Sequence, residues 1–375
     1  MRILITTATY PPSVNGVAYH VQLLFNSLTQ LGHKVMVLAP DNPNVDIPEA
    51  GIIRYPSFSS PIAENYPIGI PLVSLEKIKR FKPDIIHTHH PLIIGSLSAY
   101  LANKLSIPLF FTNHTRYQEY IKYYLPIGTK ITEKIFNRHL KHFSQKISRV
   151  ICPSPTIQQY LQKISILNTK IIPNGIDLNN FRPKIQSPTN LSLIFVGRLE
   201  KEKRPTNLIS FALQLKKTTP NFRLTIVGDG KLKPILEQQV KSLNLNKNIT
   251  FTGIISRPKL SNLLNQHHFF ISFSTSEVMP LTHLEAQACG LPTIIPKNSG
   301  LNNFLNKTNS IIASSNHKQT CKAVENTFTN KTKFNQLSKN SISNAQKYSS
   351  QNTAQQIIKL YQKKWNPSSP SSFQV

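Results

Sequence analysis

The sequence predicts an α/β protein of two domains, each a doubly wound parallel sheet with helices on both faces. Apolar strand-like runs alternate with amphipathic helical runs through the first third of the chain, and the same alternation restarts near residue 191. The polar stretch before this restart, residues 177–190, is expected to be a hinge. A chain of 375 residues is long enough for each domain to bury its own core.

The first domain is expected to span residues 1–176. Apolar side chains recur at helical spacing from Val17 to Leu31, and Gly32 follows as a stop before the next strand. Strands are expected at residues 3–7, 34–38, 84–90, 109–112 and 150–152, the last of which is expected to end the series.

The second domain is expected to span residues 191–350. The pattern from Ala345 to Trp365 is helical, and its part at 352–366 is expected to complete the first domain. Residues 367–375 are rich in Ser and Pro and are expected to be disordered. The expected strands lie at 191–197, 223–228, 268–273 and 293–295, and a helix is expected at 205–218.

The chain is strongly basic, with 44 Lys and Arg against 16 Asp and Glu and a net charge of +28. Such an excess attracts anionic partners, which include nucleic acid, anionic lipid and phosphorylated small molecules. It also reflects a shortage of acids in a chain rich in Asn, Lys, Ile and Ser. Charge alone therefore does not identify the partner.

The cysteines Cys152, Cys289 and Cys321 are scattered without metal-type spacing. This predicts a reducing compartment and argues against a disulfide framework and a zinc site. The first apolar run is too short for a signal peptide, and no run of about 18 apolar residues follows. A cytoplasmic protein that does not span the membrane is expected.

A stretch near residue 280 predicts a ligand site at a helix start. Leu281, Leu284 and Ala288 recur at helical spacing, so Glu277 is expected in the entering loop and Glu285 on the helix. The helix start leaves backbone N–H groups that suit a phosphate, and ionised carboxylates accept hydrogen bonds from sugar hydroxyls. The alternative is a capped helix with solvated glutamates.

Two further loops follow strand ends, where ligands bind in open parallel sheets. Arg198 and Lys203 could neutralise a diphosphate, although a solvated charged loop is the simpler alternative. Gly16 would let a phosphate approach the backbone, or it merely begins a helix. No Gly-x-Gly-x-x-Gly follows the first strand, so no nicotinamide or flavin cofactor is expected.

Histidines also lie at a strand end in the first domain. Alternation places His87 and His89 on one face of the strand and His90 on the other, and further metal ligands are not apparent. No metal site is therefore expected. His114 follows another strand and is expected to face the same crevice.

The spaced glutamates followed by Glu-Ala-x-Ala-Cys-Gly-Leu-Pro resemble the sugar-nucleotide signature of glycosyltransferase family 4, a retaining group with the GT-B fold. Gly-Arg-Leu-x-x-x-Lys from Gly197 resembles the family's diphosphate-binding pair. Departures are Arg204, where glycine is frequent, Val278-Met279 after Glu277, and a weak glycine-rich segment after Pro296. The resemblance implies two Rossmann-like domains facing across a cleft.

The resemblance also implies the roles of individual residues, with no protein nucleophile, cofactor or metal. His114, Glu277, Arg198 and Lys203 would be catalytic. Acceptor-side residues would be His90, Arg116 and Tyr117, in an acceptor-binding first domain. The donor, a nucleotide diphosphate sugar of the UDP-glucose or GDP-mannose type, would be bound by Gly16, Arg198, Lys203, Glu277, Met279, Pro280, Leu281, Thr282 and Glu285.

The acceptor is suggested by residues 115–149, which combine many Lys and Arg with aromatic and aliphatic side chains. Such a stretch suits an anionic membrane interface, or it is an ordinary helix with a solvated basic face. The string His-Thr-x-Tyr-x-x-Tyr from His114 resembles diacylglycerol glucosyltransferases, with phosphatidylinositol mannosyltransferases as a related possibility. A membrane lipid acceptor and a peripheral position on the inner face of the cell membrane are expected.

Other functions remain open on the sequence. A soluble or polysaccharide acceptor would keep the glycosyl transfer, and an inactive membrane-binding scaffold is suggested by Val278 and the altered segment after Pro296. The charge also suggests nucleic-acid binding, but no binding module or aromatic stacking platform is recognisable. No nucleic-acid partner is expected.

Overall fold

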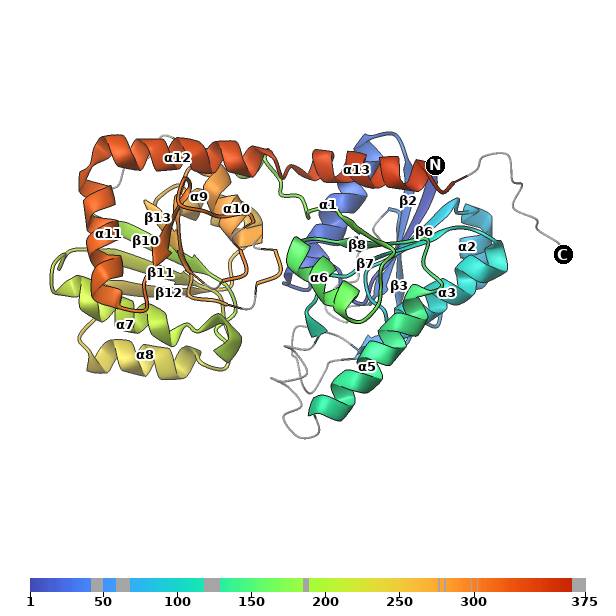
Figure 1. Cartoon of the computed structure of the whole chain (residues 1–375), viewed down its shortest axis with the longest axis horizontal. Coiled ribbons are helices and arrows are strands. Elements are labelled where there is room, and N and C mark those ends of the chain that lie inside the picture. Colours follow the sequence, from blue (N-terminus) through green and yellow to red (C-terminus); the bar gives the residue numbers. More distant parts are fainter. Residues whose placement is uncertain are drawn as a thin grey trace. The chain divides into compact units, whose positions relative to one another are not determined.

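The chain forms two compact units, each described here by itself (Figure 1). Unit 1 comprises Met1–Gly175 and Ser350–Val375, and unit 2 comprises Ile176–Ser349. The structure is a computed structural model that describes residues 1–41, 50–58, 68–117, 129–184, 189–275, 277–279, 281–297, 299–301 and 303–365. Within these ranges, no helix is long and apolar enough to cross a membrane.

Unit 1 is built on a parallel sheet with the strand order β3-β2-β1-β6-β7-β8-β9. In register, Ile3 of β1 lies between Val35 of β2 and Ile85 of β6. These strands read as continuous apolar runs because both faces of the sheet are covered. The strands are β1 Arg2–Thr6, β2 Lys34–Pro40, β3 Ile52–Tyr55, β6 Ile85–Thr88, β7 Leu109–Thr112, β8 Arg149–Cys152 and β9 Thr169–Ile171, with a separate antiparallel pair β4 Ser57–Phe58 and β5 Ile68–Gly69.

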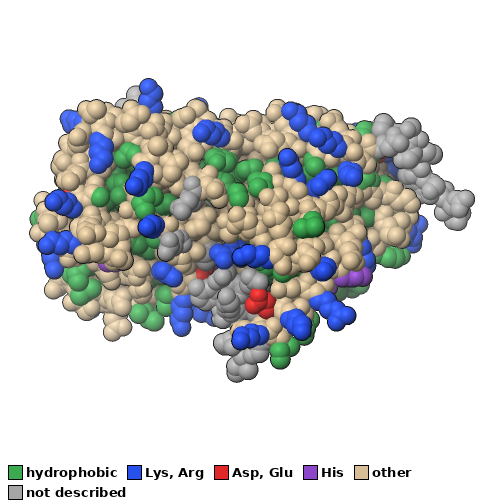
Figure 2. Space-filling model, viewed as in Figure 1, with side chains coloured by type: hydrophobic (Ala, Val, Ile, Leu, Met, Phe, Trp, Pro, Cys, Tyr) green, Lys and Arg blue, Asp and Glu red, His purple; other side chains and the backbone are tan. Residues whose placement is uncertain are grey.

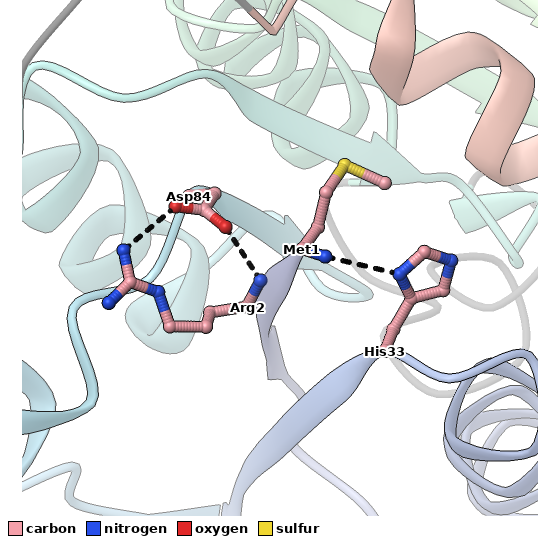
Figure 3. A network of polar contacts seen from close by, with 4 residues as sticks. All are labelled: Met1, Arg2, His33 and Asp84. Carbon is pink, nitrogen blue, oxygen red and sulfur yellow. Dashed lines mark hydrogen bonds and ion pairs between the residues drawn. The ribbon is translucent and has the colours of Figure 1, made fainter. Parts of the chain in front are cut away.

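Helix α13, near the end of the chain, belongs to unit 1 and packs beside α1, as Figure 1 shows. Tyr361 of α13 is fully buried, and its hydroxyl lies 2.7 Å from His87 Nδ1. At the amino end of β1, the Arg2 guanidinium donates to the Asp84 carboxylate across 3.1 Å (Figure 3). The helices of unit 1 are α1 Gly16–Gln30, α2 Leu75–Phe81, α3 Ile93–Leu105, α5 Thr129–Ser144, α6 Pro155–Lys163 and α13 Ser350–Gln362.

Unit 2 repeats the parallel arrangement, with the strand order β12-β11-β10-β13-β14-β15. Its core contains large buried side chains such as Phe195, Phe211 and Phe269. The strands are β10 Ser192–Val196, β11 Arg223–Val227, β12 Ile249–Gly253, β13 Phe269–Ile271, β14 Thr293–Pro296 and β15 Ser310–Ala313. The helices are η1 Lys201–Lys203, α7 Thr206–Lys216, α8 Lys233–Ser242, α9 Arg257–Leu264, α10 Leu281–Ala288, α11 His317–Thr329 and α12 Lys331–Gln346.

Two expectations about individual elements are wrong. Strand β9 follows β8 and pairs with it, so the strand at 150–152 does not end the series. The helical pattern from Ala345 to Trp365 is broken at residues 347–349, because α12 ends at Gln346 and α13 begins at Ser350. This break is the point at which the chain leaves unit 2 and returns to unit 1.

The described part of the segment expected to be a hinge packs within unit 2. Ser261 Oγ of α9 donates to the carbonyl of Asn180 across 2.5 Å, and Phe181 is fully buried. The chain passes from unit 1 to unit 2 at Gly175–Ile176. Ile176 forms a parallel bridge with Ser349, so the two crossing points lie side by side. The expected tail at 367–375 lies outside the described residues.

Candidate active site

Glycines shape the loops after β10 and β11 at the carboxyl edge of the unit 2 sheet. Gly228 has a φ of +131°, and a Cβ placed on it would lie 2.0 Å from the carbonyl oxygen of Gly197. No larger residue fits there without moving the backbone. The same two loops are also joined by a hydrogen bond of 2.8 Å from Leu199 N to the carbonyl oxygen of Asp229. The close approach of the two loops therefore requires glycine at position 228.

The loop after β10 holds the two predicted diphosphate-binding cations. Arg198 Nη2 lies 2.7 Å from Glu202 Oε1, which comes from a buried side chain in the same loop. Glu202 belongs to the single turn η1, and Arg204 closes this turn with a φ of +50°. Arg204 thus adopts the left-handed conformation that a glycine at this position would favour.

Lys203 and Glu277 are brought together from loops 74 residues apart. Lys203 Nζ lies 2.5 Å from Glu277 Oε1, and the two side chains are 21% and 14% exposed. Burial opposes the charged form of Glu277, but the Lys203 cation, together with His283 and Ser274, more than offsets it and lowers the pKa of the carboxyl to about 2. Glu277 is therefore an ionised acceptor beside a cation at neutral pH.

Glu285 lies on α10, as predicted, and is fully buried. Its Oε2 accepts a hydrogen bond of 2.6 Å from Arg257 Nη1, while its Oε1 has no partner among the described residues. Burial raises the pKa of Glu285, and Arg257 offsets this only in part. A buried oxygen without a partner is costly, and a ligand hydroxyl would satisfy it.

Helix α10 begins at Leu281, where backbone N–H groups were predicted to meet a phosphate. Met279 and Leu281 are buried and Thr282 is half-buried, while Pro280 lies outside the described residues. His283 was not predicted as a site residue. It packs on Phe270 with ring centroids 4.6 Å apart, and burial lowers its pKa to about 4.

The carboxyl edge of the unit 1 sheet carries a cluster of histidines. His89 Nδ1 lies 2.8 Å from His114 Nε2, and the His20 ring lies 4.9 Å from that of His114. His20 and His89 are buried and His114 is half-buried. Burial, reinforced by the neighbouring imidazoles, lowers the pKa of His114 well below its usual value. The cluster is therefore neutral at neutral pH.

The sequence places His114 at the same edge as His89, but it does not show that their side chains meet. His20 comes from α1 and was not predicted as a site residue. Asn113 was also missed, and neither polar atom of its buried side chain has a partner in the described part of the chain. Strand alternation alone placed no further metal-ligand residue near His89. The fold brings two histidines to it from other elements, His20 and His114.

The remaining predicted residues of unit 1 are His90, Arg116, Tyr117 and Gly16. His90 Nδ1 accepts a hydrogen bond of 3.0 Å from Ala8 N, and burial lowers the pKa of His90 to about 4. Tyr117 packs on Phe136 of α5 with the ring centroids 4.5 Å apart and the rings tilted by 38°, and Arg116 is half-buried. Gly16 is the exposed first residue of α1.

Comparison with known proteins assigns both units. The model "Glycosyltransferase Family 4" matches residues 14–180, and "Glycosyl transferases group 1" matches residues 178–348. The alpha-monoglucosyldiacylglycerol synthase of Streptococcus pneumoniae is 32% identical, over 81% of this chain and 73% of that protein. The GDP-mannose-dependent alpha-mannosyltransferase of Corynebacterium glutamicum is 28% identical, over 82% and 75% respectively.

Comparison of the fold with solved structures agrees with this family assignment. HepE of Anabaena, solved in complex with UDP-glucose, superposes with a TM-score of 0.72 over 97% of this chain and 100% of that one, at 18% identity. The predicted GT-B class of two parallel-sheet domains is confirmed. This chain belongs to glycosyltransferase family 4 and is a glycosyltransferase of the GT-B fold.

Proposed function

We propose that the protein transfers a hexose from a nucleotide diphosphate sugar to a hydroxyl group of a membrane lipid such as diacylglycerol. The observation that carries the proposal is the contact of Lys203 with ionised Glu277, in the same unit as Arg198. Cations suit the diphosphate and an ionised carboxylate suits the sugar hydroxyls. The names of the two curated relatives support this donor and acceptor class.

The donor is assigned to unit 2. Arg198 and Lys203 already contact Glu202 and Glu277, so the diphosphate has to share each cation with a carboxylate. Arg offers five N–H donors and Lys three, which is enough for both partners. These cations and the N–H groups at the start of α10 would stabilise the leaving diphosphate, and no metal ion is needed for this step.

The two glutamates would recognise different parts of the donor. Glu277 keeps Oε2 for hydroxyls of the transferred hexose, because Oε1 contacts Lys203. Glu285 keeps the unpartnered Oε1 for the ribose hydroxyls, because Oε2 accepts from Arg257. Met279, Pro280 and Thr282 would complete the donor contacts.

The acceptor is assigned to unit 1. His114 would support the reacting centre through Nδ1, since its Nε2 contacts His89. His90, Arg116 and Tyr117 would lie on the acceptor side, and Gly16 would meet a phosphate through its N–H. Retention of the anomeric configuration follows from the retaining character of the family that the sequence resembles.

An anionic membrane surface is the proposed location. Helix α5 exposes Ile131 and Ile135, which are 69% and 64% exposed, and several of its Lys and Arg side chains are also exposed. A helix that combines exposed aliphatic and basic side chains suits the interface of an anionic membrane. Figure 2 shows Lys and Arg scattered over the visible face with few acidic side chains. A peripheral position on the inner face of the cell membrane is consistent with this surface.

The experiment is a panel of UDP- and GDP-sugars, each incubated in EDTA with liposomes of anionic phospholipid and diacylglycerol. A glycolipid product with the anomeric configuration of the donor is expected, and NMR spectroscopy of the product reads this configuration. A product of inverted configuration would contradict retention, and dependence on Mg²⁺ would contradict the metal-free donor site.

The same panel distinguishes the alternative functions from the proposed transfer to a lipid. Donor hydrolysis without a lipid product would replace the lipid by a soluble or polysaccharide acceptor. Liposome binding without any donor binding, measured by calorimetry, would favour an inactive membrane-binding scaffold.

A further inference from the structure

The buried carboxylate of Glu285 offers a ligand one of its two oxygens. Oε2 accepts a hydrogen bond of 2.6 Å from Arg257 Nη1, and the Glu285 side chain is fully buried. Oε1 has no partner among the residues that the structure describes. A buried oxygen without a partner is costly, so Oε1 is the atom that a ligand hydroxyl would satisfy. Arg257 therefore determines which oxygen remains for the ligand.

Arg257 reaches Glu285 from a different helix. It is the first residue of α9, which follows β12 at the carboxyl edge of the unit 2 sheet. A cation at a helix N-terminus is opposed by the helix dipole, so Arg257 does not stabilise its own helix. The contact with the Glu285 carboxylate offsets this unfavourable charge. The position of Arg257 is thus explained by Glu285 rather than by α9.

The Arg257 guanidinium is itself held by packing. Its central carbon lies 5.9 Å from the centroid of the Phe181 ring, which is within the range of a cation–π contact. Phe181 is fully buried, and its backbone N–H donates to the carbonyl of Asp177 across 2.9 Å. A planar guanidinium presents its N–H groups in a rigid fork. The hydrogen bond to Glu285 therefore starts from an oriented donor.

The charges around Glu285 oppose one another. Burial, which is the largest effect, raises the pKa of Glu285, Arg257 lowers it, and the Asp177 carboxylate raises it. Asp177 is held in its own turn by two backbone N–H groups that donate to Oδ1. The neighbouring Cys289 thiol stays neutral, because burial raises its pKa to about 12. Of these groups, Arg257 is the one that favours the ionised form of Glu285.

We propose that Arg257 is a positioning residue for the donor nucleotide: it holds Glu285 with Oε1 toward the ribose hydroxyls, and so sets a preference for ribonucleotides over deoxyribonucleotides. This inference rests on the ribose role of Glu285 in the proposed function. An ionised carboxylate accepts the stronger, charge-assisted hydrogen bonds. Without Arg257, burial and Asp177 both favour the protonated carboxyl, and nothing described fixes which oxygen faces the ligand.

The test measures ribose selectivity, which is the Kd of a 2′,3′-dideoxynucleoside diphosphate divided by the Kd of the ribonucleoside diphosphate. Calorimetry of the full chain at pH 7 gives this ratio for uridine and guanosine nucleotides. The wild type is expected to show a selectivity of about 10- to 100-fold, because the lost contact is a hydrogen bond to a charged group. Arg257→Gln and Glu285→Gln should each reduce it to about threefold or less, and the double variant should reduce it no further, because the two residues act as one unit.

The pH dependence distinguishes positioning from mere support of the fold. In the wild type, selectivity should appear as the pH rises through the pKa of Glu285. Loss of the Arg257 cation raises this pKa, so selectivity in Arg257→Gln should appear only at a higher pH. Glu285→Gln should show low selectivity at every pH. Arg257→Lys keeps the cation without the planar fork and should retain part of the selectivity at pH 7.

Arg223→Gln is the control for the loss of one cation from unit 2. Arg223 is exposed at the amino end of β11, so this variant should keep the wild-type selectivity. Circular dichroism reads whether each variant folds. If Arg257→Gln does not fold, Arg257→Met takes its place, because it keeps an aliphatic side chain for packing without the charge.

Two results would overturn the inference and leave the proposed function standing. One is wild-type selectivity in folded Arg257→Gln together with its loss in Glu285→Gln. The other is an equal loss of affinity for both nucleotides in Arg257→Gln, since this would show that Arg257 only supports the fold. Wild-type selectivity in Glu285→Gln, or no nucleotide binding by the wild type, would overturn the proposed donor site and this inference with it.

Discussion

Lys203 Nζ and Glu277 Oε1 lie 2.5 Å apart, and this contact joins the loop after β10 to the loop that enters α10. The pair combines a cation for a diphosphate with a carboxylate for a sugar. Because the carboxylate is held ionised by its partner, the contact also contributes to stability in a way that depends on pH.

The first prediction concerns acid. The pKa of Glu277 is about 2 in the folded chain against an ordinary value of 4.5 for a glutamate side chain, so its stabilisation is fully present above pH 4.5 and is lost as the pH falls toward 2. Glu277→Gln should lower the free energy of unfolding by about 3 kcal/mol at pH 7, with this difference shrinking below pH 4.5. Urea unfolding at pH 7, 4.5 and 3 measures it, and a difference independent of pH would refute the assignment.

The second prediction concerns Glu285. Burial raises its pKa, so the charged form is unfavourable in the folded chain, and Glu285→Gln should leave stability at neutral pH nearly unchanged. The same change should weaken donor binding about 10- to 100-fold, because a charge-assisted hydrogen bond is worth about 1.5–3 kcal/mol. Calorimetry with UDP and GDP measures binding, and an unaltered Kd for the nucleotide that the wild type binds would contradict the ribose role.

The third prediction concerns Gly228. A Cβ there would lie 2.0 Å from the Gly197 carbonyl oxygen, so Gly228→Ala should cost at least about 3 kcal/mol and displace the loop that carries Arg198. The matched control is Gly32→Ala, which also has a positive φ, of +83°, but would meet nothing within 4 Å. That control should cost only about 1–2 kcal/mol of backbone strain. Equal losses in the two variants would show that the close approach is unimportant.

The fourth prediction concerns the membrane. Lys130 and Lys134 are exposed on α5 next to Ile131 and Ile135. Reversing both charges with Lys130→Glu and Lys134→Glu should reduce binding to anionic liposomes at least tenfold, since each basic side chain near such a surface contributes about 1 kcal/mol. Cosedimentation at several salt concentrations measures it. The double reversal of Lys241 and Lys217, exposed in unit 2, is the control, and equal losses would indicate a response to net charge alone.

Much of the fold follows from local patterns. Strands such as β7 are buried on both faces and therefore read as continuous apolar runs, which is why Leu109–Thr112 was predicted with its observed bounds. Strand β9 was missed because its three residues lie at the sheet edge and are not buried. The break between α12 and α13 was missed because none of its three residues, Lys347, Tyr348 and Ser349, is a Gly or Pro that would indicate the end of a helix.

The site was predictable only where its residues share a loop or a helix. The motif positions of Lys203, Glu277 and Glu285 could be read from the sequence, but their partners could not. Arg257 reaches Glu285 from α9, and His20 reaches His114 from α1. Such contacts depend on how elements distant in sequence pack together, and no local pattern records them.

The most direct test of the central claim compares the initial rate of glycolipid formation by the wild type, Glu277→Gln and Glu237→Gln. Glu237 is an exposed side chain of α8 and serves as the control for loss of one carboxylate. The proposed site predicts that the wild type and Glu237→Gln form product at similar rates, while Glu277→Gln is at least 100-fold slower. Wild-type rates in folded Glu277→Gln would contradict the assignment of the sugar-binding carboxylate.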